Sequence, residues 1–382
     1  MKTIYTPLPS ENNLFFRYKI EKLKAIKEEL EYFVENTDFV NHEAFTNQVL
    51  FPYEVKSNNA IEGYHEDIAS IISVMDEPNL KKDDMNSEYQ RIANLYKGYQ
   101  YILRKPNLTE ENLYNLYRIL SKNLLEGTDR LQKGCHYRRD EVFIFFSSNP
   151  DVKPDHGADY TKIPTYMQML FEYINTDNEN LSTTDKFIKS QIIHFYFVYI
   201  HPYFDINGRT SRTTGIWYLN NNKAYPYTLF NRGINLKKGK YYEIIRTVKK
   251  YTDLTPFLLY MLEQTKTELE KEYIINSINS SIHGELSPIN RQTLQYILSN
   301  NAGNTLLDLV TLYNRFNPKK KAKSFEEEMM VPLTDLGIIE IKRKTSKGIA
   351  PPQLTNYEYS LNSTMIDNNP KKIKRLKLEK FI

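Results

Sequence analysis

Two apolar segments of this chain flank a short polar run, His201-Pro202-Tyr203-Phe204-Asp205-Ile206-Asn207-Gly208-Arg209-Thr210-Ser211-Arg212. The preceding segment, residues 192–200, is long enough for a buried helix, and residues 213–219 predict the body of a second helix. A glycine-containing turn that leads into a helix offers free backbone N–H groups to an anion. Arg209 and Arg212 lie three residues apart, on one face of the second helix. The run therefore predicts a phosphate site, with His201 placed to take a proton from the attacking group.

The same run resembles the signature of the Fic family, His-x-Phe-x-(Asp/Glu)-Gly-Asn-(Gly/Lys)-Arg-x-x-Arg. Six functional positions match in order, and Tyr203 replaces the phenylalanine; the six are His201, Asp205, Asn207, Gly208, Arg209 and Arg212. The resemblance covers about residues 50–265. It implies a mainly α-helical Fic core with a short β-hairpin flap. The implied activity is protein adenylyl transfer, in which AMP moves from ATP to a Ser, Thr or Tyr hydroxyl of a target protein.

The resemblance also implies a role for each position of the site. His201 would be the general base, and Asp205 would hold Mg²⁺, a cation usually bound by one or two carboxylates together with substrate phosphates. The implied nucleotide- and phosphate-binding residues are Asp205, Ile206, Asn207, Gly208, Arg209, Thr210, Arg212, Tyr241 and Tyr242. Plainer alternatives stay open: His201 as a cap of the preceding helix, Asp205 as the N-cap of the next helix, and the two tyrosines as packing residues.

A short strand is predicted at residues 142–146, because β-branched and aromatic residues there precede a Ser-Ser-Asn-Pro turn. It lies where Fic proteins carry the flap, a hairpin edge that pairs with the main chain of the target. Edge pairing gives affinity without demanding much of the target sequence. The resemblance therefore makes Val142, Phe143, Ile144 and Phe145 target-binding residues. A strand that only covers the core is the alternative.

A second resemblance concerns Ser57-Asn58-Asn59-Ala60-Ile61-Glu62-Gly63. Many Fic proteins carry an inhibitory helix with the pattern (Ser/Thr)-x-x-x-Glu-(Gly/Asn), which here falls near residues 55–63. The resemblance implies that Glu62 pairs with Arg212 and prevents productive placement of the γ-phosphate. Asn58 stands where the pattern has Ser or Thr, so we expect the helix to dock with altered anchoring. The alternative is an ordinary helix that ends at Gly63 with a solvated Glu62.

Ile206 departs from the Fic signature, which has glycine at this position. Glycine tolerates a positive φ, whereas a β-branched residue in that conformation costs about 1–2 kcal/mol. We expect a negative φ at Ile206, because the rest of the run is intact. A positive φ would favour weak catalysis or a reversed nucleotide, as in Doc, a relative that lacks this glycine and acts as a kinase. Doc-like sequences carry Lys where this chain has Gly208, so adenylyl transfer stays ahead of phosphorylation or another phosphate-ester transfer.

Composition predicts a globular protein of two or three domains, since the 382 residues are 40% hydrophobic and 13% aromatic. The single cysteine, Cys135, excludes an internal disulfide and favours a reducing compartment. No signal-peptide pattern or bilayer-long apolar run is present, so we expect a soluble, cytoplasmic protein without a membrane partner. His194 is expected in the core or supporting the site, because further zinc ligands at recognised spacings are missing.

The pattern along the chain divides it into four parts. Residues 1–100 predict a mostly helical N-terminal region, with helices at 15–33, 68–74 and 86–101. Residues 101–270 form the expected Fic core, with helices at 107–125, 165–174, 184–200 and 239–262. A polar bridge, residues 271–284, is expected to be a linker. Residues 285–382, with helices at 287–298, 305–316 and 324–336 and strands at 338–341 and 357–361, resemble a winged helix-turn-helix.

The C-terminal part is also the basic part, with 16 Lys and Arg against 10 Asp and Glu in residues 284–382. Clusters at Lys319-Lys320-Lys321 and in the predicted wing favour DNA binding. A solvated face or a protein partner explains the same charges. A nucleotide-sensing, DNA-binding regulator is therefore the non-enzymatic alternative. Beyond ATP and a hydroxyl-bearing target protein, the expected partners are DNA or protein at this domain, the protein itself by auto-modification, and a second copy in a homodimer.

Overall fold

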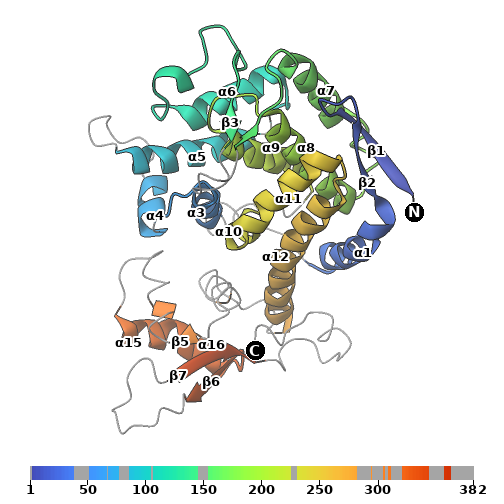
Figure 1. Ribbon diagram of the computed structural model, residues 1–382. Helices are drawn as coiled ribbons and strands as arrows, with labels where there is room; N and C mark the ends of the chain where they lie inside the picture. The colour runs from blue at the N-terminus through green and yellow to red at the C-terminus, as the bar shows by residue number, and fades with distance from the viewer. Residues whose placement is uncertain are drawn as a thin grey trace.

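The computed structural model describes residues 2–37, 51–66, 68–76, 86–104, 106–144, 154–224, 230–281, 294, 304–305, 309–310, 321–343 and 357–362. Within these ranges the chain is mainly α-helical, as predicted (Figure 1). Two central helices are buried along nearly their whole length, α8 (Thr183–Ile200) and α9 (Asn207–Asn221). A helix that is buried on all sides belongs at the centre of a fold. The turn between α8 and α9 carries the polar run.

Other helices surround this central pair, and most begin where the sequence predicts. They are α1 (Ile20–Asn36), α3 (Phe51–Ile61), α4 (Ile68–Asp76), α5 (Ser87–Leu103), α6 (Glu110–Ser121), α7 (Ile163–Asn175), α10 (Phe230–Leu236), α11 (Lys238–Tyr251) and α12 (Thr255–Ser281). The side chains of Asn86, Thr109 and Ser182 each accept a hydrogen bond from the first turn of a helix, α5, α6 and α8 respectively. Among the described helices, none has the length and hydropathy to cross a membrane.

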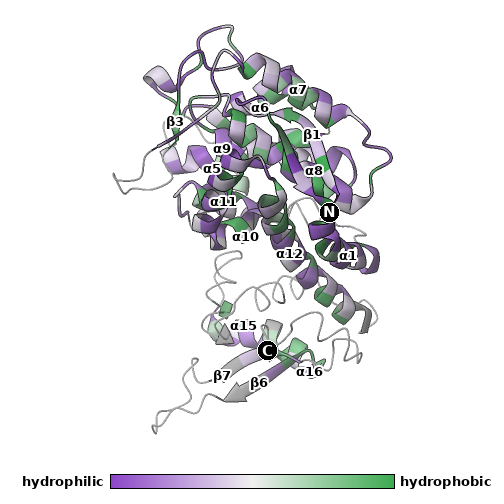
Figure 2. Cartoon of the chain, turned by 45° about the vertical axis from the view of Figure 1, so that its right-hand side comes forward, coloured by the Kyte–Doolittle hydropathy of each residue, from purple (hydrophilic) through white to green (hydrophobic). Residues whose placement is uncertain are grey.

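The predicted helix at residues 15–33 is wrong over its first turn. An antiparallel hairpin opens the chain, with β1 (Thr3–Pro9) paired to β2 (Phe15–Lys19), and α1 follows it directly. Phe16 is buried, and its ring packs edge-on against Phe195 and Tyr199 of α8, with centroids 5.2 and 5.0 Å away. These contacts between residues far apart in the sequence favour a strand at Phe16, and the local hydrophobic pattern cannot predict them. In Figure 2 much of the visible surface of α1 is hydrophilic, while its apolar residues Leu23, Ile26, Leu30 and Phe33 are buried.

Two boundaries near the end of the Fic core also differ from the prediction. The expected helix 239–262 is two helices, because Thr252 takes a left-handed conformation with φ 53° and ends α11. The expected linker is helical as far as Ser281, since α12 continues through its first eleven residues. Tyr273, Ile274 and Ile278 are buried on this extension, and the ring of Tyr273 lies 5.6 Å from that of Phe33 in α1. Residues 282–284 lie outside the described residues.

The C-terminal elements lie below the helical body in both views (Figures 1 and 2). Residues 322–335 are helical, in three consecutive pieces: α15 (Ala322–Phe325), the π-helix Glu326–Met330, and α16 (Val331–Asp335). Strands β6 (Ile339–Arg343) and β7 (Tyr357–Leu361) form the expected hairpin, and β5 (Asn304–Thr305) pairs with β7. Thr305 therefore belongs to a strand and not to a helix. Most of the predicted helices 287–298 and 305–316 lies outside the described residues, so the winged helix stays a prediction.

Candidate active site

His201 ends helix α8 and begins the turn. Its φ of 53° and ψ of 61° are left-handed, and its backbone N–H donates to the carbonyl of Phe197 at 2.9 Å. Burial lowers the pKa of the imidazole to about 4, against the hydrogen bond to Val198, and the cations of Lys249 and Arg138 lower it further. The ring is therefore neutral near pH 7 and able to accept a proton. Because Nδ1 lies 3.4 Å from the carbonyl oxygen of Val198, we assign the proton to Nδ1 and the free lone pair to Nε2.

The turn after His201 is closed by side chains that the sequence assigned to phosphate. The Asn207 amide is buried; its Oδ1 accepts from the backbone N–H of Tyr203 at 3.0 Å, and its Nδ2 donates to the same residue's carbonyl at 2.8 Å. Thr210 Oγ1 donates to the carbonyl of Ile206 at 2.8 Å. These two side chains hold the turn in this structure, and their role as phosphate contacts stays a prediction. The backbone N–H groups of Asn207, Gly208 and Arg209 precede the first hydrogen bond of α9 and remain suited to an anion.

Ile206 has a positive φ of 67°, so the expected negative φ is wrong. Its side chain is only 2% exposed and belongs to the hydrophobic core. The cause is local: the Asn207 amide closes the turn, and Asp205 Oδ1 accepts the Ile206 N–H at 2.6 Å. The backbone takes the shape that a glycine would give, at a cost of about 1–2 kcal/mol. The sequence did contain a signal for this conformation: the Fic signature has glycine at this position, and glycine readily takes a positive φ.

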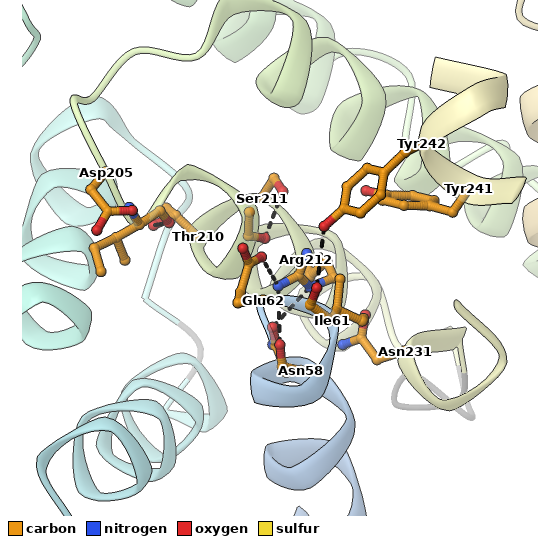
Figure 3. A network of polar contacts seen from close by, with 12 residues as sticks. Asn58, Ile61, Glu62, Asp205, Thr210, Ser211, Arg212, Asn231, Tyr241 and Tyr242 are labelled. Carbon is orange, nitrogen blue, oxygen red and sulfur yellow. Dashed lines mark hydrogen bonds and ion pairs between the residues drawn. The ribbon is translucent and has the colours of Figure 1, made fainter. Parts of the chain in front are cut away.

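Helix α3 docks against the signature arginine Arg212, which is 1% exposed (Figure 3). Arg212 Nη2 donates to Glu62 Oε1 at 2.5 Å, and Nε donates to Asn58 Oδ1 at 2.8 Å. Burial alone would raise the pKa of Glu62, but Arg212 and Arg209 outweigh it and lower that pKa below its usual value. The predicted Glu62–Arg212 pair is therefore present, and the amide of Asn58 provides the altered anchoring that we expected.

The end of α3 is shaped to deliver Glu62 to the turn. Gly63 has a φ of 93°, and the backbone N–H of Tyr64 donates to the carbonyl of Asn59 at 3.1 Å, which ends the helix in a Schellman motif. Glu62 Oε1 then lies where a side chain on Gly208 would be, only 2.2 Å from the position of a Cβ built there. A side chain at position 208 would therefore force the Glu62 carboxylate to shift.

A buried polar chain continues from Asn58 into the core, and the sequence reasoning missed it. Asn58 Nδ2 donates to the Tyr99 hydroxyl at 2.8 Å, and that hydroxyl lies 3.4 Å from Glu54 Oε1. Asn231 Nδ2 also donates to Glu54 Oε1. Burial raises the pKa of Glu54 to about 8. The i, i+4 spacing of Glu54, Asn58 and Glu62 was the available signal, since it places all three on one helical face.

Arg209, the first of the two signature arginines, lies in the first turn of α9. Arg209 is buried, its guanidinium carbon lies 5.8 Å from the centre of the Tyr64 ring, and its Nε has no hydrogen-bond partner among the described residues. An unpartnered buried N–H beside a helix N-terminus is a donor suited to phosphate. Asp205 is exposed next to it, with its carboxylate oriented by the Ile206 N–H. A single carboxylate beside a phosphate site is the donor set of Mg²⁺ that is shared with substrate phosphates, and Mg²⁺ at Asp205 stays a prediction.

The two predicted nucleotide-side tyrosines lie behind this site. Tyr241 is buried, and its hydroxyl is 2.9 Å from Nε2 of His194. The Tyr242 hydroxyl donates to the carbonyl of Ile61 in α3 at 3.2 Å (Figure 3). In this structure Tyr241 contacts His194 and Tyr242 contacts α3, and their role as nucleotide contacts stays a prediction. Burial, and then the Arg212 cation, lower the pKa of His194 to about 3, which confirms it as a neutral core residue.

The predicted flap is a two-residue hairpin ladder beside the turn. Strand β3 (Phe143–Ile144) pairs antiparallel with β4 (Asp155–His156), and Phe143 is 56% exposed. Lys249 of α11 fixes β4, because its Nζ donates to Asp155 Oδ2 at 2.7 Å and to the carbonyl of His156 at 2.6 Å. Val142 directly precedes β3. Phe145 lies outside the described residues.

Residues 107–219 match the family profile described as "Fic/DOC family". This chain contains a Fic/DOC family domain. The domain spans α6 to α9 and therefore includes the flap and the complete signature turn. Helix α3, which carries the residues of the predicted inhibitory helix, precedes the matched residues.

Curated relatives and solved structures agree with this assignment. The protein adenylyltransferases Fic of Drosophila melanogaster and Drosophila yakuba are 23% and 24% identical over 214 residues, which is 55% of this chain and 39% of each relative. The chain thus spans about two fifths of the length of these relatives. A Fic family protein from Desulfovibrio desulfuricans shares the fold with a TM-score of 0.51 at 19% identity, over 90% of this chain and 95% of that one. Fic-1 from C. elegans has a TM-score of 0.51 at 13% identity, over 69% and 73% of the two chains.

Proposed function

We propose that this protein is a protein adenylyltransferase that transfers AMP from ATP to a hydroxyl side chain of a target protein and is restrained by Glu62. The observation that carries the proposal is the Glu62–Arg212 contact of 2.5 Å at the N-terminal end of α9. A buried guanidinium beside free helix N–H groups favours an anion, and here a carboxylate takes that place. The names of the Drosophila relatives support the same reaction at the level of the family.

In the proposed reaction His201 Nε2 accepts the proton of the target hydroxyl as its oxygen attacks the α-phosphorus of ATP. The bond between the α-phosphorus and the bridging oxygen breaks, and pyrophosphate leaves. Arg209, Arg212 and the first N–H groups of α9 would stabilise the charge that develops on the phosphates, which is usually the largest contribution to catalysis. Asp205 would hold Mg²⁺, which supplies further neutralisation of the phosphate charge.

Gly208 favours this reaction over its enzymatic alternative, because Doc-like sequences carry Lys there. The positive φ of Ile206, by contrast, is the conformation that we expected to favour weak catalysis or a reversed nucleotide. The Ile206 backbone keeps the shape of the glycine in the family signature, and its side chain points into the core, so it leaves room for phosphate beside the turn. A Doc-like kinase, or another nucleotide or phosphate-ester transferase, remains the second candidate, because a strained residue stands in the phosphate turn. Label from α-labelled ATP on the protein would report transfer of AMP, whereas label from γ-labelled ATP would report transfer of the phosphoryl group.

The test is intact-mass analysis of protein incubated with Mg·ATP, using wild type, Glu62→Gly and Glu62→Gly/His201→Ala. We expect an AMP-sized gain on the protein that is largest in Glu62→Gly and absent in the double variant. Parallel reactions with α- and γ-labelled ATP identify the group that moves. A phosphate-sized gain, or γ-label on the protein, would replace adenylyl transfer with the kinase alternative.

A further inference from the structure

Arg138 is the most buried cation around the flap, with only 1% of its surface exposed. Its guanidinium donates to three backbone carbonyls: Nε to His201 at 2.8 Å, Nη1 to Asp140 at 2.5 Å, and Nη2 to Ala158. Burying a guanidinium is costly unless its donors are paired. All three of these hydrogen bonds end on main-chain oxygens, so the pairing fixes backbone positions.

The three carbonyls belong to separate parts of the site. Asp140 lies just before strand β3, Ala158 lies just after β4, and His201 carries the predicted base. Two main-chain bonds reinforce this junction, because the N–H of Arg138 donates to Pro202 at 2.9 Å and that of Ala158 donates to Ile200 at 3.1 Å. One side chain therefore joins both ends of the flap to the residue that ends α8.

Space around this junction is tight. A Cβ built on Gly157 would lie 2.5 Å from Arg138 Nη2 and 3.0 Å from His201 Cβ. The guanidinium and the histidine thus approach the flap main chain as closely as a glycine allows. The relative position of flap and histidine is set by direct contact.

His201 itself needs such support. Its left-handed backbone is disfavoured for a non-glycine residue by about 1–2 kcal/mol and persists only where neighbouring contacts hold it. Arg138 Nε donates to the carbonyl oxygen of His201. This hydrogen bond fixes the direction in which the chain leaves α8. The planar fork of arginine suits this task, since its donors point in fixed directions.

We propose that Arg138 is a positioning residue, which fixes His201 and the flap as one unit so that a hydroxyl presented along the flap meets the imidazole at the right distance. The inference rests on the proposed function, because it assumes that the flap presents a target. Misplacement by about 1 Å can cost on the order of 100-fold in rate. Nucleotide binding should depend less on Arg138, since Arg209 and Arg212 lie on α9.

The test compares Arg138→Gln and Arg138→Lys with Arg139→Gln, all in the Glu62→Gly protein. Arg139 is the matched control, because it is the adjacent arginine and is exposed. We expect Arg138→Gln to lower kcat about 100-fold while KM for ATP changes less than about threefold. Arg138→Lys should recover part of kcat, because an ammonium can reach some of the carbonyls but lacks the fork. Equal kcat in Arg138→Gln and Arg139→Gln would overturn the proposal.

A second readout does not need catalysis. The His201 imidazole is followed by NMR in histidine-labelled protein and is identified by its loss in His201→Ala. Removing the nearby cation and loosening the junction should move the titration of His201 upward, from about 4 toward the ordinary histidine pKa near 6.5. A His201 titration in Arg138→Gln that matches the Arg139→Gln control would also overturn the proposal.

The two readouts, kcat and the titration of His201, allow the role of Arg138 to be tested separately from the proposed function. If Glu62→Gly transfers no AMP, the proposed function fails, while the His201 titration still decides the role of Arg138. If Arg138→Gln does not fold, Arg138→Lys decides, since it keeps the charge and loses the fork. We expect it to fold with a reduced kcat, and a kcat equal to that of the Arg139→Gln control would reject the positioning role.

Discussion

Glu62 Oε1 lies 2.5 Å from Arg212 Nη2, across 150 residues of sequence. The contact joins Glu62, which directly follows α3 and belongs to the predicted inhibitory segment (the brake), to the helix that begins at the phosphate turn. Because the guanidinium is buried and also bonded to Asn58, it has few other directions in which to donate. A substrate phosphate that needs the same donor must compete with a carboxylate already in place.

Replacing Glu62 with glycine should therefore raise AMP transfer. A coupling between two sites is typically worth 1–3 kcal/mol, so we expect an increase of about 5- to 150-fold in the rate of auto-modification. The measurement is incorporation of α-labelled ATP into purified protein. Glu28→Gly, an exposed glutamate on α1, is the control. A rate equal to wild type would show that the contact does not restrain catalysis.

Replacing Gly208 with alanine should dislodge the brake by a steric route. The new Cβ would fall 2.2 Å from Glu62 Oε1, so the carboxylate cannot stay where it is. We expect the amides of α3 to exchange with deuterium faster, on the order of 10-fold for each 1.4 kcal/mol of docking lost. Gly239→Ala is the matched control, because a Cβ there meets nothing within 4 Å. Unchanged deuterium exchange of the α3 amides would show that the Glu62 carboxylate does not lie beside residue 208 in solution.

Asn58 and Asn59 are adjacent and both buried, yet they should respond differently to alanine. The amide of Asn58 bonds Arg212 and Tyr99, whereas Oδ1 and Nδ2 of Asn59 have no hydrogen-bond partner among the described residues. Asn58→Ala leaves two buried donors or acceptors unpaired, so it should lower the free energy of unfolding by about 1–3 kcal/mol. Asn59→Ala should cost clearly less, because no hydrogen bond is lost. Urea unfolding of both variants measures the difference, and equal losses would refute the role of Asn58.

The sequence was sufficient for most of the helical core and for the position of the turn between α8 and α9, because burial patterns and helix caps are local. The sequence-based prediction failed where contacts between residues far apart in the sequence determine the structure. The strand at Phe16 depends on rings of α8, and the extension of α12 depends on a buried face shared with α1. Asn207 illustrates the same limit within the site, since spacing identifies the residue but not the carbonyl and N–H that its amide binds.

The pH dependence of the free energy of unfolding should reveal the ionisation of the Glu54 carboxyl. Burial raises the pKa of this carboxyl to about 8, against the hydrogen bonds from Asn231 and Tyr99 and the Arg212 cation, while Glu268 also acts to raise it. A raised carboxyl pKa means that stability is complete below the unfolded value near 4.5 and is lost as the pH rises to about 8. His194 and His201, whose pKa values are lowered, lose stability in the opposite direction as the pH falls below about 6.5. Between pH 7 and 9 these histidines no longer contribute, but Lys189, whose pKa burial lowers to about 8, gains stability as Glu54 loses it. A comparison with a variant that lacks the Glu54 carboxyl therefore isolates Glu54.

Between pH 7 and 9 the wild-type protein should lose about 1.4 kcal/mol of unfolding free energy through this group, since the folded form ionises near pH 8. Glu54→Gln keeps an acceptor for Asn231 and cannot ionise, so its stability at pH 9 relative to pH 7 should exceed that of wild type by about 1.4 kcal/mol. Urea unfolding at pH 7, 8 and 9 compares the two proteins. Because Glu54 lies on the face of α3 that carries Asn58 and Glu62, ionisation should also loosen the brake, and AMP transfer by wild type should rise with pH relative to Glu54→Gln. Parallel pH profiles for the two proteins, in stability and in rate, would contradict this role.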